Sequence, residues 1–162
     1  MPPAFPDPKL SEKRRQEQED EEMDRAYQRA RQIVWRSYSD FMGWDAGMPV
    51  KAVEGGGVRA DPDEMERRRA LFRRDWDGFG RWRAGRKREL QADGKRLEPI
   101  YVKDRATGAI AVKAQALLKQ FGEFLGFLAA ERRRRKLEKQ REEMMAEWER
   151  AGRGGKGLAD DD

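Results

Sequence analysis

The sequence predicts a mainly α-helical protein with three long amphipathic helices, one small β-hairpin before the last helix, and flexible termini. Apolar residues recur at steps of three and four in three separate stretches, which is the spacing of an amphipathic helix. Charged residues make up 41% of the 162 residues and apolar residues 37%, and the mean hydropathy is −1.09. This composition favours long helices with narrow apolar seams over a large globular core.

The first helix is expected over residues 23–42, where one apolar stripe consists of Met23, Tyr27, Ala30, Val34 and Phe41. Residues 1–22 are expected to form an extended, charged N-terminal arm, because four of the seven prolines fall within the first ten residues. Glu12–Glu22 contains no apolar residue, so it is either a solvated extension of the helix, capped at Ser11, or disordered.

Residues 48–60, MPVKAVEGGGVRA, predict a linker because glycine and small residues dominate them. The run Gly55–Gly57 could cradle a phosphate, but no GKS or GKT follows it, which argues against a phosphate-binding loop.

The second helix is expected over residues 61–90. Asp61 is a helix-capping residue type, Pro62 suits the first helical position, and Glu64 stands at the spacing of a capping box. Glycines at 78, 80 and 85 weaken the helix, and a break near Gly78–Gly80 is the alternative to a continuous helix.

Residues 99–112 predict a β-hairpin, since two short β-prone runs flank the turn-forming KDRATG. An isolated hairpin is marginally stable, so it should pack on a helix or on another chain. The third helix is expected over 113–149, within a helical domain of residues 23–150. The Gly-rich and acidic residues 151–162 are expected to be flexible. The predicted core consists of Tyr27, Val34, Phe41, Phe72, Trp76, Phe79, Leu117, Phe121, Phe124 and Leu128.

The chain contains no cysteine and no histidine. Disulfides, thiolate chemistry, Cys/His zinc sites and imidazole acid–base catalysis are therefore excluded. Clusters of carboxylates at Asp61–Glu64 and Asp160–Asp162 are better explained by capping and by a tail than by a metal site. We therefore expect no catalytic residue, no metal and no cofactor. The remaining enzymatic alternative is a small hydrolase or nuclease that uses only Asp/Glu side chains and a metal.

Between Arg67 and Arg88 there are ten cations, against two acids, Asp75 and Asp77. Cations with interleaved aromatic residues are typical of nucleic-acid-binding grooves. The four aromatic residues of this stretch recur at helical spacing, however, which favours burial in a seam over stacking on bases. Contact with phosphate is predicted for Arg67, Arg68, Arg73, Arg74, Arg81, Arg83, Arg86, Lys87 and Arg88.

The third helix carries the predicted partner-binding residues, namely Phe124, Leu125, Leu128, Met144, Met145 and Trp148. The run Arg132–Lys136 is either a solvated, ion-paired part of the helix or a nuclear-localisation or phosphate-binding patch. The spacing of Gly122 and Gly126 predicts close packing against another helix of the same chain.

The apolar residues are few for helices of this length, so we expect that other chains cover part of them. The leading hypothesis is a non-catalytic structural or assembly subunit of a larger complex that contains nucleic acid, such as a virion or a ribonucleoprotein particle. The alternative is a free-standing nucleic-acid-binding module that uses residues 67–88. The expected partners are other protein subunits, a second copy of the chain, and RNA or DNA. The N-terminus lacks the features of a secretion signal and no window is apolar enough to span a membrane, so we expect an intracellular or virion location.

Overall fold

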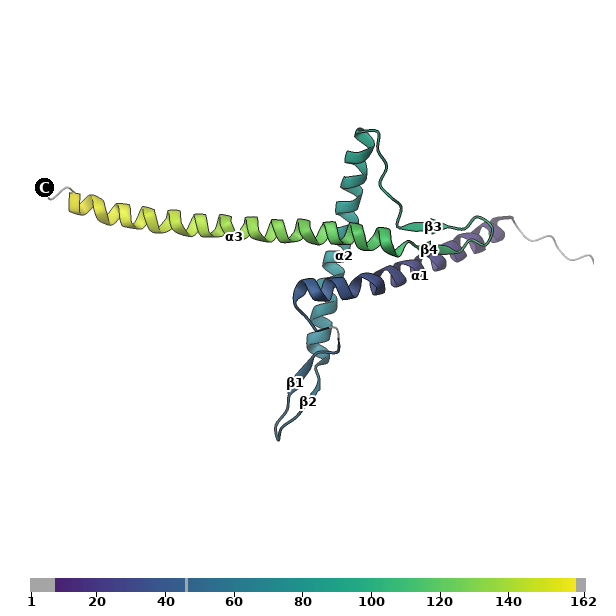
Figure 1. Cartoon of the computed structure of the whole chain (residues 1–162), viewed down its shortest axis with the longest axis horizontal. Helices are drawn as coiled ribbons and strands as arrows, with labels where there is room; N and C mark the ends of the chain where they lie inside the picture. Colours follow the sequence, from purple (N-terminus) through teal and green to yellow (C-terminus); the bar gives the residue numbers. More distant parts are fainter. Residues whose placement is uncertain (1–7, 46, 160–162) are drawn as a thin grey trace, which may run out of the picture. The chain divides into compact units, whose positions relative to one another are not determined.

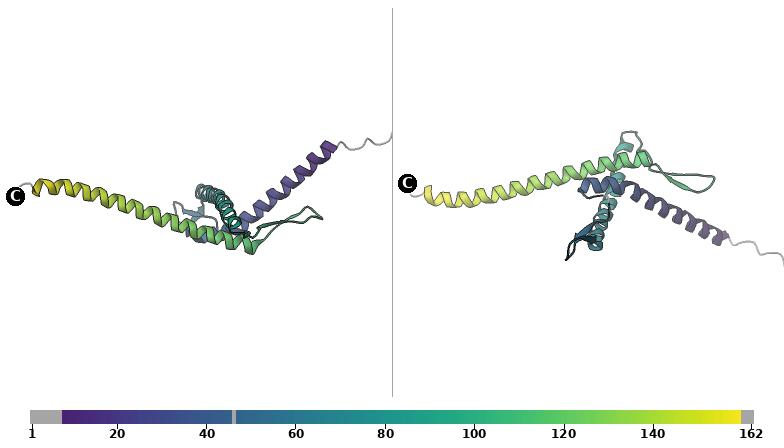
Figure 2. Two further views of the ribbon diagram at one scale, coloured as in Figure 1. Left: turned by 90° about the horizontal axis from the view of Figure 1, so that it is seen from above. Right: turned by 60° about the horizontal axis from the view of Figure 1, so that its bottom comes forward.

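The computed structural model describes residues 8–45 and 47–159, with side chains described up to Gly152. These residues are mostly helical, as predicted, and the three helices appear as continuous ribbons (Figures 1 and 2). The chain divides into two compact units, and the boundary falls between Phe124 and Leu125. We call them the N-terminal unit and the C-terminal unit. The element order is α1 (Pro8–Met42), β1 (Val50–Ala52), β2 (Val58–Ala60), α2 (Pro62–Ala92), β3 (Tyr101–Lys103), β4 (Ile110–Val112) and α3 (Ala114–Ala159).

Helix α1 begins at Pro8, so Glu12–Glu22 is helical, Ser11 lies inside the helix, and the prediction of an extended arm is wrong for residues 8–22. Residues 1–7 lie outside the described part of the chain. Pro8–Gln18 is exposed throughout, in agreement with its lack of a continuous apolar face.

The buried stripe of α1 consists of Ala26, Ala30, Val34 and Tyr38, which are fully buried. The buried stripe therefore lies on a helix face that is turned about the helix axis from the predicted stripe. Tyr27 is 39% exposed, although it was predicted to lie in the core. Two alanines at a spacing of four let neighbouring backbone approach α1 closely, and this placement is not apparent from hydrophobicity alone.

The predicted linker contains a second β-hairpin, in which β1 and β2 pair in antiparallel register with Val50 opposite Ala60. Gly55, Gly56 and Gly57 all have φ between +87° and +103°, a backbone region that favours glycine, and they reverse the chain between the strands. These glycines join two strands, whereas a phosphate-binding loop joins a strand to a helix. The hairpin escaped prediction because its strands are three residues long and exposed on both faces.

Helix α2 starts as predicted, because the Asp61 carboxylate accepts a hydrogen bond from the backbone N–H of Glu64 at 3.2 Å. The second half of a capping box is absent. The backbone N–H of Asp61 donates to the carbonyl of Pro49, and the Glu64 carboxylate accepts from Arg67 and Arg68 instead. The helix is continuous through its glycines. A Cβ at Gly78 would lie 3.4 Å from the Phe124 ring, so glycine there permits close packing of α2 on α3.

The predicted hairpin forms from β3 and β4, with Tyr101 opposite Val112. It packs on α1, as expected for so small a sheet, and β4 lies beside α1 in Figure 1. Arg29 of α1 donates to the carbonyl of Ile110 at 2.6 Å, and the Tyr27 and Tyr101 rings meet edge to face at 5.4 Å.

The core of the N-terminal unit is built from aromatic residues of α1, α2 and α3. Phe79 lies 5.2 Å from Phe121 and 5.5 Å from Phe124 between ring centroids, and Phe72 lies 5.2 Å from Tyr38. The predicted core is confirmed for Val34, Phe72, Phe79, Leu117, Phe121 and Phe124. Phe41, Trp76 and Leu128 are only partly buried.

Helix α3 continues to Ala159, beyond the predicted end near residue 149, so the predicted tail is helical over 151–159. Residues 160–162 lie outside the described part of the chain, and the flexibility of 151–162 stays a prediction. A Cβ at Gly122 or Gly126 would meet nothing within 4 Å, so the predicted close packing at these two glycines is wrong for the described residues.

Candidate nucleic-acid and partner interfaces

The nine cations predicted to contact phosphate all lie on α2, which the structure describes in full, and most have an acidic neighbour on the same helix. The pairs are Arg67 and Arg68 with Glu64, Arg73 with Glu66, Arg74 with Asp75, and Arg86 with Glu89, at N–O distances from 2.7 to 3.5 Å. In three of the five pairs the acid lies three or four residues away on the helix, so it pairs with a cation that appears unbalanced in a simple charge count. The predicted phosphate-binding stripe along the whole helix is therefore weakened, and phosphate contact stays a prediction.

Glu64 shows the strength of this local pairing. The pKa of its carboxyl is lowered to about 2, because Arg67 and Arg68 donate hydrogen bonds to the charged form. Arg67 accordingly has a raised pKa. These groups stabilise the first turns of α2 and have less charge available for a ligand.

Asp75, one of the two acids between Arg67 and Arg88, is buried. It accepts a hydrogen bond from the Tyr38 hydroxyl of α1 and lies 3.4 Å from Arg74. This carboxylate therefore links α1 to α2 and satisfies a buried phenol.

Arg83 is a structural residue of the N-terminal unit. Its Nε donates to the Gln120 side chain at 2.6 Å, and its Nη2 donates to the carbonyl of Glu98 at 3.1 Å. Gln120, which is buried, donates to the same carbonyl at 2.7 Å. Burial lowers the pKa of the Arg83 guanidinium, and the nearby Tyr101 partly offsets that effect. The network ties α2, the chain before β3, and the start of α3 together.

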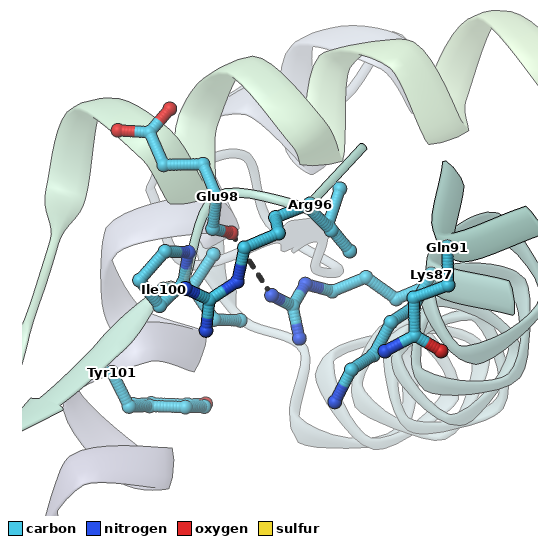
Figure 3. A pocket seen from close by; sticks show the side chains of 9 residues that line it. Lys87, Gln91, Arg96, Glu98, Ile100 and Tyr101 are labelled. Atoms are coloured by element: carbon cyan, nitrogen blue, oxygen red, sulfur yellow. Dashed lines mark hydrogen bonds between the residues drawn. The ribbon is translucent and has the colours of Figure 1, made fainter. Parts of the chain in front are cut away.

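A hollow of about 620 Å³ lies next to this network. It is lined by Arg83, Lys87, Gln91, Arg96, Leu97, Glu98, Pro99, Ile100 and Tyr101. In Figure 3 the nitrogen ends of Lys87 and Arg96 lie around the hollow, while the carboxylate of Glu98 points away from it. Three cations thus meet without a facing carboxylate, an arrangement that suits an anion such as phosphate. Arg96 was not among the predicted residues, because it follows α2 and only the fold brings it near Lys87.

Tyr101 forms one wall of the hollow, and burial raises the pKa of its phenol to about 12. The phenol is therefore neutral at physiological pH. A second, more apolar hollow of about 330 Å³ adjoins the first and shares Arg83, Lys87, Ile100 and Tyr101 with it. Tyr27, Trp76 and Phe79 complete its aromatic lining. Aromatic side chains beside a cationic hollow suit a ligand that combines a phosphate with a ring.

The aromatic residues of α2 mainly serve the core, as their helical spacing indicated. Phe72 and Phe79 are buried, and Trp76 and Trp82 are partly buried against Phe121 and Phe124. A row of α2 aromatics stacked on bases is therefore incompatible with this core.

The predicted partner-binding residues separate into two groups. Phe124 and Leu125 are only 2% and 8% exposed, so the prediction is wrong for these two, and Leu128 is partly buried. Met144, Met145 and Trp148 are 67%, 55% and 77% exposed. Leu137, which the prediction omitted, is 64% exposed.

The part of α3 that carries the exposed residues is exposed on all sides. Every residue from Arg132 to Gly152 is classed as exposed. A helix gains most of its stability in proteins from packing an apolar face, and the apolar side chains of this stretch are not buried in the described part of the chain.

Among the described residues, no cluster of three or more acidic side chains could hold a metal ion, and no helix is long and apolar enough to cross a membrane. No protein-family model, curated protein or solved structure matches the chain.

Proposed function

We propose that this protein is a non-catalytic assembly subunit whose C-terminal helix docks onto another chain. One observation carries the proposal: Leu137, Met144 and Trp148 are large apolar side chains on a helix that is exposed from Arg132 to Gly152. Exposed apolar side chains that gather on one surface mark interaction sites. We propose further that the larger complex contains nucleic acid, as a virion or a ribonucleoprotein particle does. The protein would then act inside the cell or in a virion.

Isolation of the full chain from its natural host would test docking. We expect it to migrate well above its mass of 18.9 kDa and to carry its other subunits in fixed stoichiometry. Met144→Lys should lose this association, because it places a charge at the exposed apolar surface.

Ala146→Lys is the matched control for this experiment. It adds the same charge two residues away, about 160° from Met144 around the helix axis. Equal loss in both variants, or a native chain that migrates alone, would contradict docking through this surface.

A second candidate function is phosphate recognition in a nucleic acid, and the hollow between α2 and the chain before β3 favours it. Arg83, Lys87 and Arg96 line the hollow, and Glu98 turns its carboxylate away from it (Figure 3). Such contacts recognise the backbone and carry no sequence information.

Binding of a fluorescent single-stranded oligonucleotide across a salt series would test this second function. We expect affinity to fall as salt rises, and the double variant Lys87→Gln/Arg96→Gln to bind more weakly and with a shallower salt slope.

The control Arg88→Gln/Lys95→Gln removes the same charge from exposed residues that do not line the hollow. If both double variants lose affinity equally, binding depends on total charge and the hollow has no special part in it.

A further inference from the structure

We propose that the partner of the exposed C-terminal helix is a second copy of this chain, paired with it in antiparallel orientation. This inference rests on the proposed function, because it names the chain that covers the docking surface. Three features of residues 130–151 support it: a seven-residue apolar repeat, exposure of that repeat, and an uneven distribution of charge along the helix.

The repeat consists of small or apolar residues at Ala130, Leu137, Met144 and Ala151, each seven residues after the previous one. Trp148 lies four residues after Met144 and three before Ala151, so it joins the same stripe. Steps of seven, divided into three and four, are the pattern by which two helices pack along a common seam. We call these five residues the α3 stripe.

The α3 stripe is available for such packing. All five residues are exposed, and the three large side chains are more than half exposed. The stripe extends over three heptads, or about 30 Å of helix, which reaches the length expected of a short coiled coil.

Charge along this part of α3 has opposite sign at its two ends. Arg132–Lys136 is five consecutive cations, whereas Glu142–Glu149 contains four glutamates and no cation. Two copies in parallel would place like blocks side by side. Two antiparallel copies would place the basic block of each against the acidic block of the other, an attraction that selects orientation and register.

Arg134 and Arg141 are not part of the α3 stripe, but they lie three residues before Leu137 and Met144 and so border the same helix face. A polar residue at such a position weakens a helix pair but restricts its partner and register. The long arginine side chains can lay their methylenes along the seam while their guanidinium groups reach the glutamates of the opposite copy. Arg134 also pairs with Glu131 of its own helix at 2.8 Å, so the glutamates of the opposite copy add to that contact, and an uncharged or purely basic partner would offer no such acid.

Among the described residues, no other exposed helical stretch of the chain could cover the α3 stripe. Pro8–Gln18 of α1 is the other long exposed stretch, and its one large apolar side chain is Leu10. Such a surface cannot fill a three-heptad seam, whereas the α3 stripe is complementary to itself.

Sedimentation equilibrium of the full chain over a range of concentrations tests the proposal. We expect a reversible monomer–dimer equilibrium, and we expect Met144→Lys to raise the dimer dissociation constant by about tenfold or more, because a charge then enters the seam. Ala146→Lys, on the opposite side of the helix, should leave the constant nearly unchanged. A chain that stays monomeric at all concentrations, or equal effects of the two variants, would overturn self-pairing.

Disulfide cross-linking determines the relative orientation of the two helices. Because the chain has no native cysteine, only the introduced cysteines can form disulfides. Chains with Ala130→Cys and chains with Ala151→Cys are mixed and oxidised. Antiparallel pairing predicts disulfides between the two kinds of chain, because the ends of the stripe meet across the pair. Disulfides formed within each kind alone, or none at all, would overturn the antiparallel pairing.

The outcomes also separate this inference from the proposed function. If the purified chain is monomeric but the native complex is lost with Met144→Lys and kept with Ala146→Lys, self-pairing fails and docking onto a different protein stands. If the dimer forms as described but the native chain carries no other subunit, self-pairing stands and the larger complex fails.

Discussion

Two stretches of the same helix, α3, have opposite surroundings. In Ala114–Phe124, Leu117, Phe121 and Phe124 are buried in the aromatic core of the N-terminal unit. In Arg132–Gly152 every residue is exposed, although Leu137, Met144 and Trp148 are equally apolar. Thirteen of the 21 residues in 132–152 are charged, against two of the 11 in 114–124, so a few large apolar side chains do not by themselves make a stretch of helix part of the core. Among the described residues, no buried apolar side chain lies between Arg132 and Gly152, and the apolar side chains there remain exposed.

The largest expected difference between the stretches comes from removing one large side chain in each. Phe121→Ala should lower the free energy of unfolding by about 3–5 kcal/mol, because it leaves a cavity against Phe79 and Trp76. Leu137→Ala should change it by less than about 0.5 kcal/mol in dilute, monomeric protein. Urea unfolding followed by tryptophan fluorescence measures both, and similar losses in the two variants would break the comparison.

The polar network at the start of α3 should have the next largest effect. Arg83→Met removes the hydrogen bonds to Gln120 and to the Glu98 carbonyl, and it should cost about 1–3 kcal/mol of stability. Arg81→Met is the control, since Arg81 is exposed on the same helix. Thermal unfolding measures the difference, and an unchanged midpoint for Arg83→Met would show that the network is dispensable.

The cap of α2 should have a smaller effect. Asp61→Ala removes the acceptor for the backbone N–H of Glu64 and should cost about 1 kcal/mol. Asp61→Asn retains a capping oxygen and should retain most of the stability. A loss of equal size in both variants would point to the charge of Asp61 and not to capping.

The smallest expected effect depends on pH. The pKa of Glu64 is lowered to about 2 from an ordinary value of 4.5, so its folded state favours the charged form. Its stabilising effect is present above pH 4.5 and is lost as the pH falls through about 2. The midpoint difference between the wild type and Glu64→Gln should therefore shrink from pH 5 to pH 2, and it should be small throughout because the group is near the surface. A difference that grows on acidification would contradict this account.

Much of the fold could be predicted because its signals are local. The cap at Asp61, the β3–β4 hairpin and the helical spacing of Phe72 and Phe79 depend on neighbouring residues, and all three predictions are confirmed. The β1–β2 hairpin was missed because three exposed residues per strand give no alternation of apolar and polar side chains.

The candidate sites were harder to predict, because they depend on contacts between residues far apart in sequence. Arg83 was predicted to contact phosphate, yet it bonds to Gln120, thirty-seven positions away. Phe124 was predicted to contact a partner, yet Phe79 and Trp82 cover it. Periodicity shows that such residues share a face, but it does not show whether another part of the chain covers that face.

Amide hydrogen exchange along α3 tests the central claim most directly, namely that the apolar side chains Leu137, Met144 and Trp148 are exposed in the isolated chain. In dilute, monomeric full-length chain, we predict slow exchange over 114–124 and exchange over 132–152 that is faster by orders of magnitude, with protection of 132–152 appearing only when a partner is bound. Slow exchange over 132–152 in a proven monomer would contradict the account.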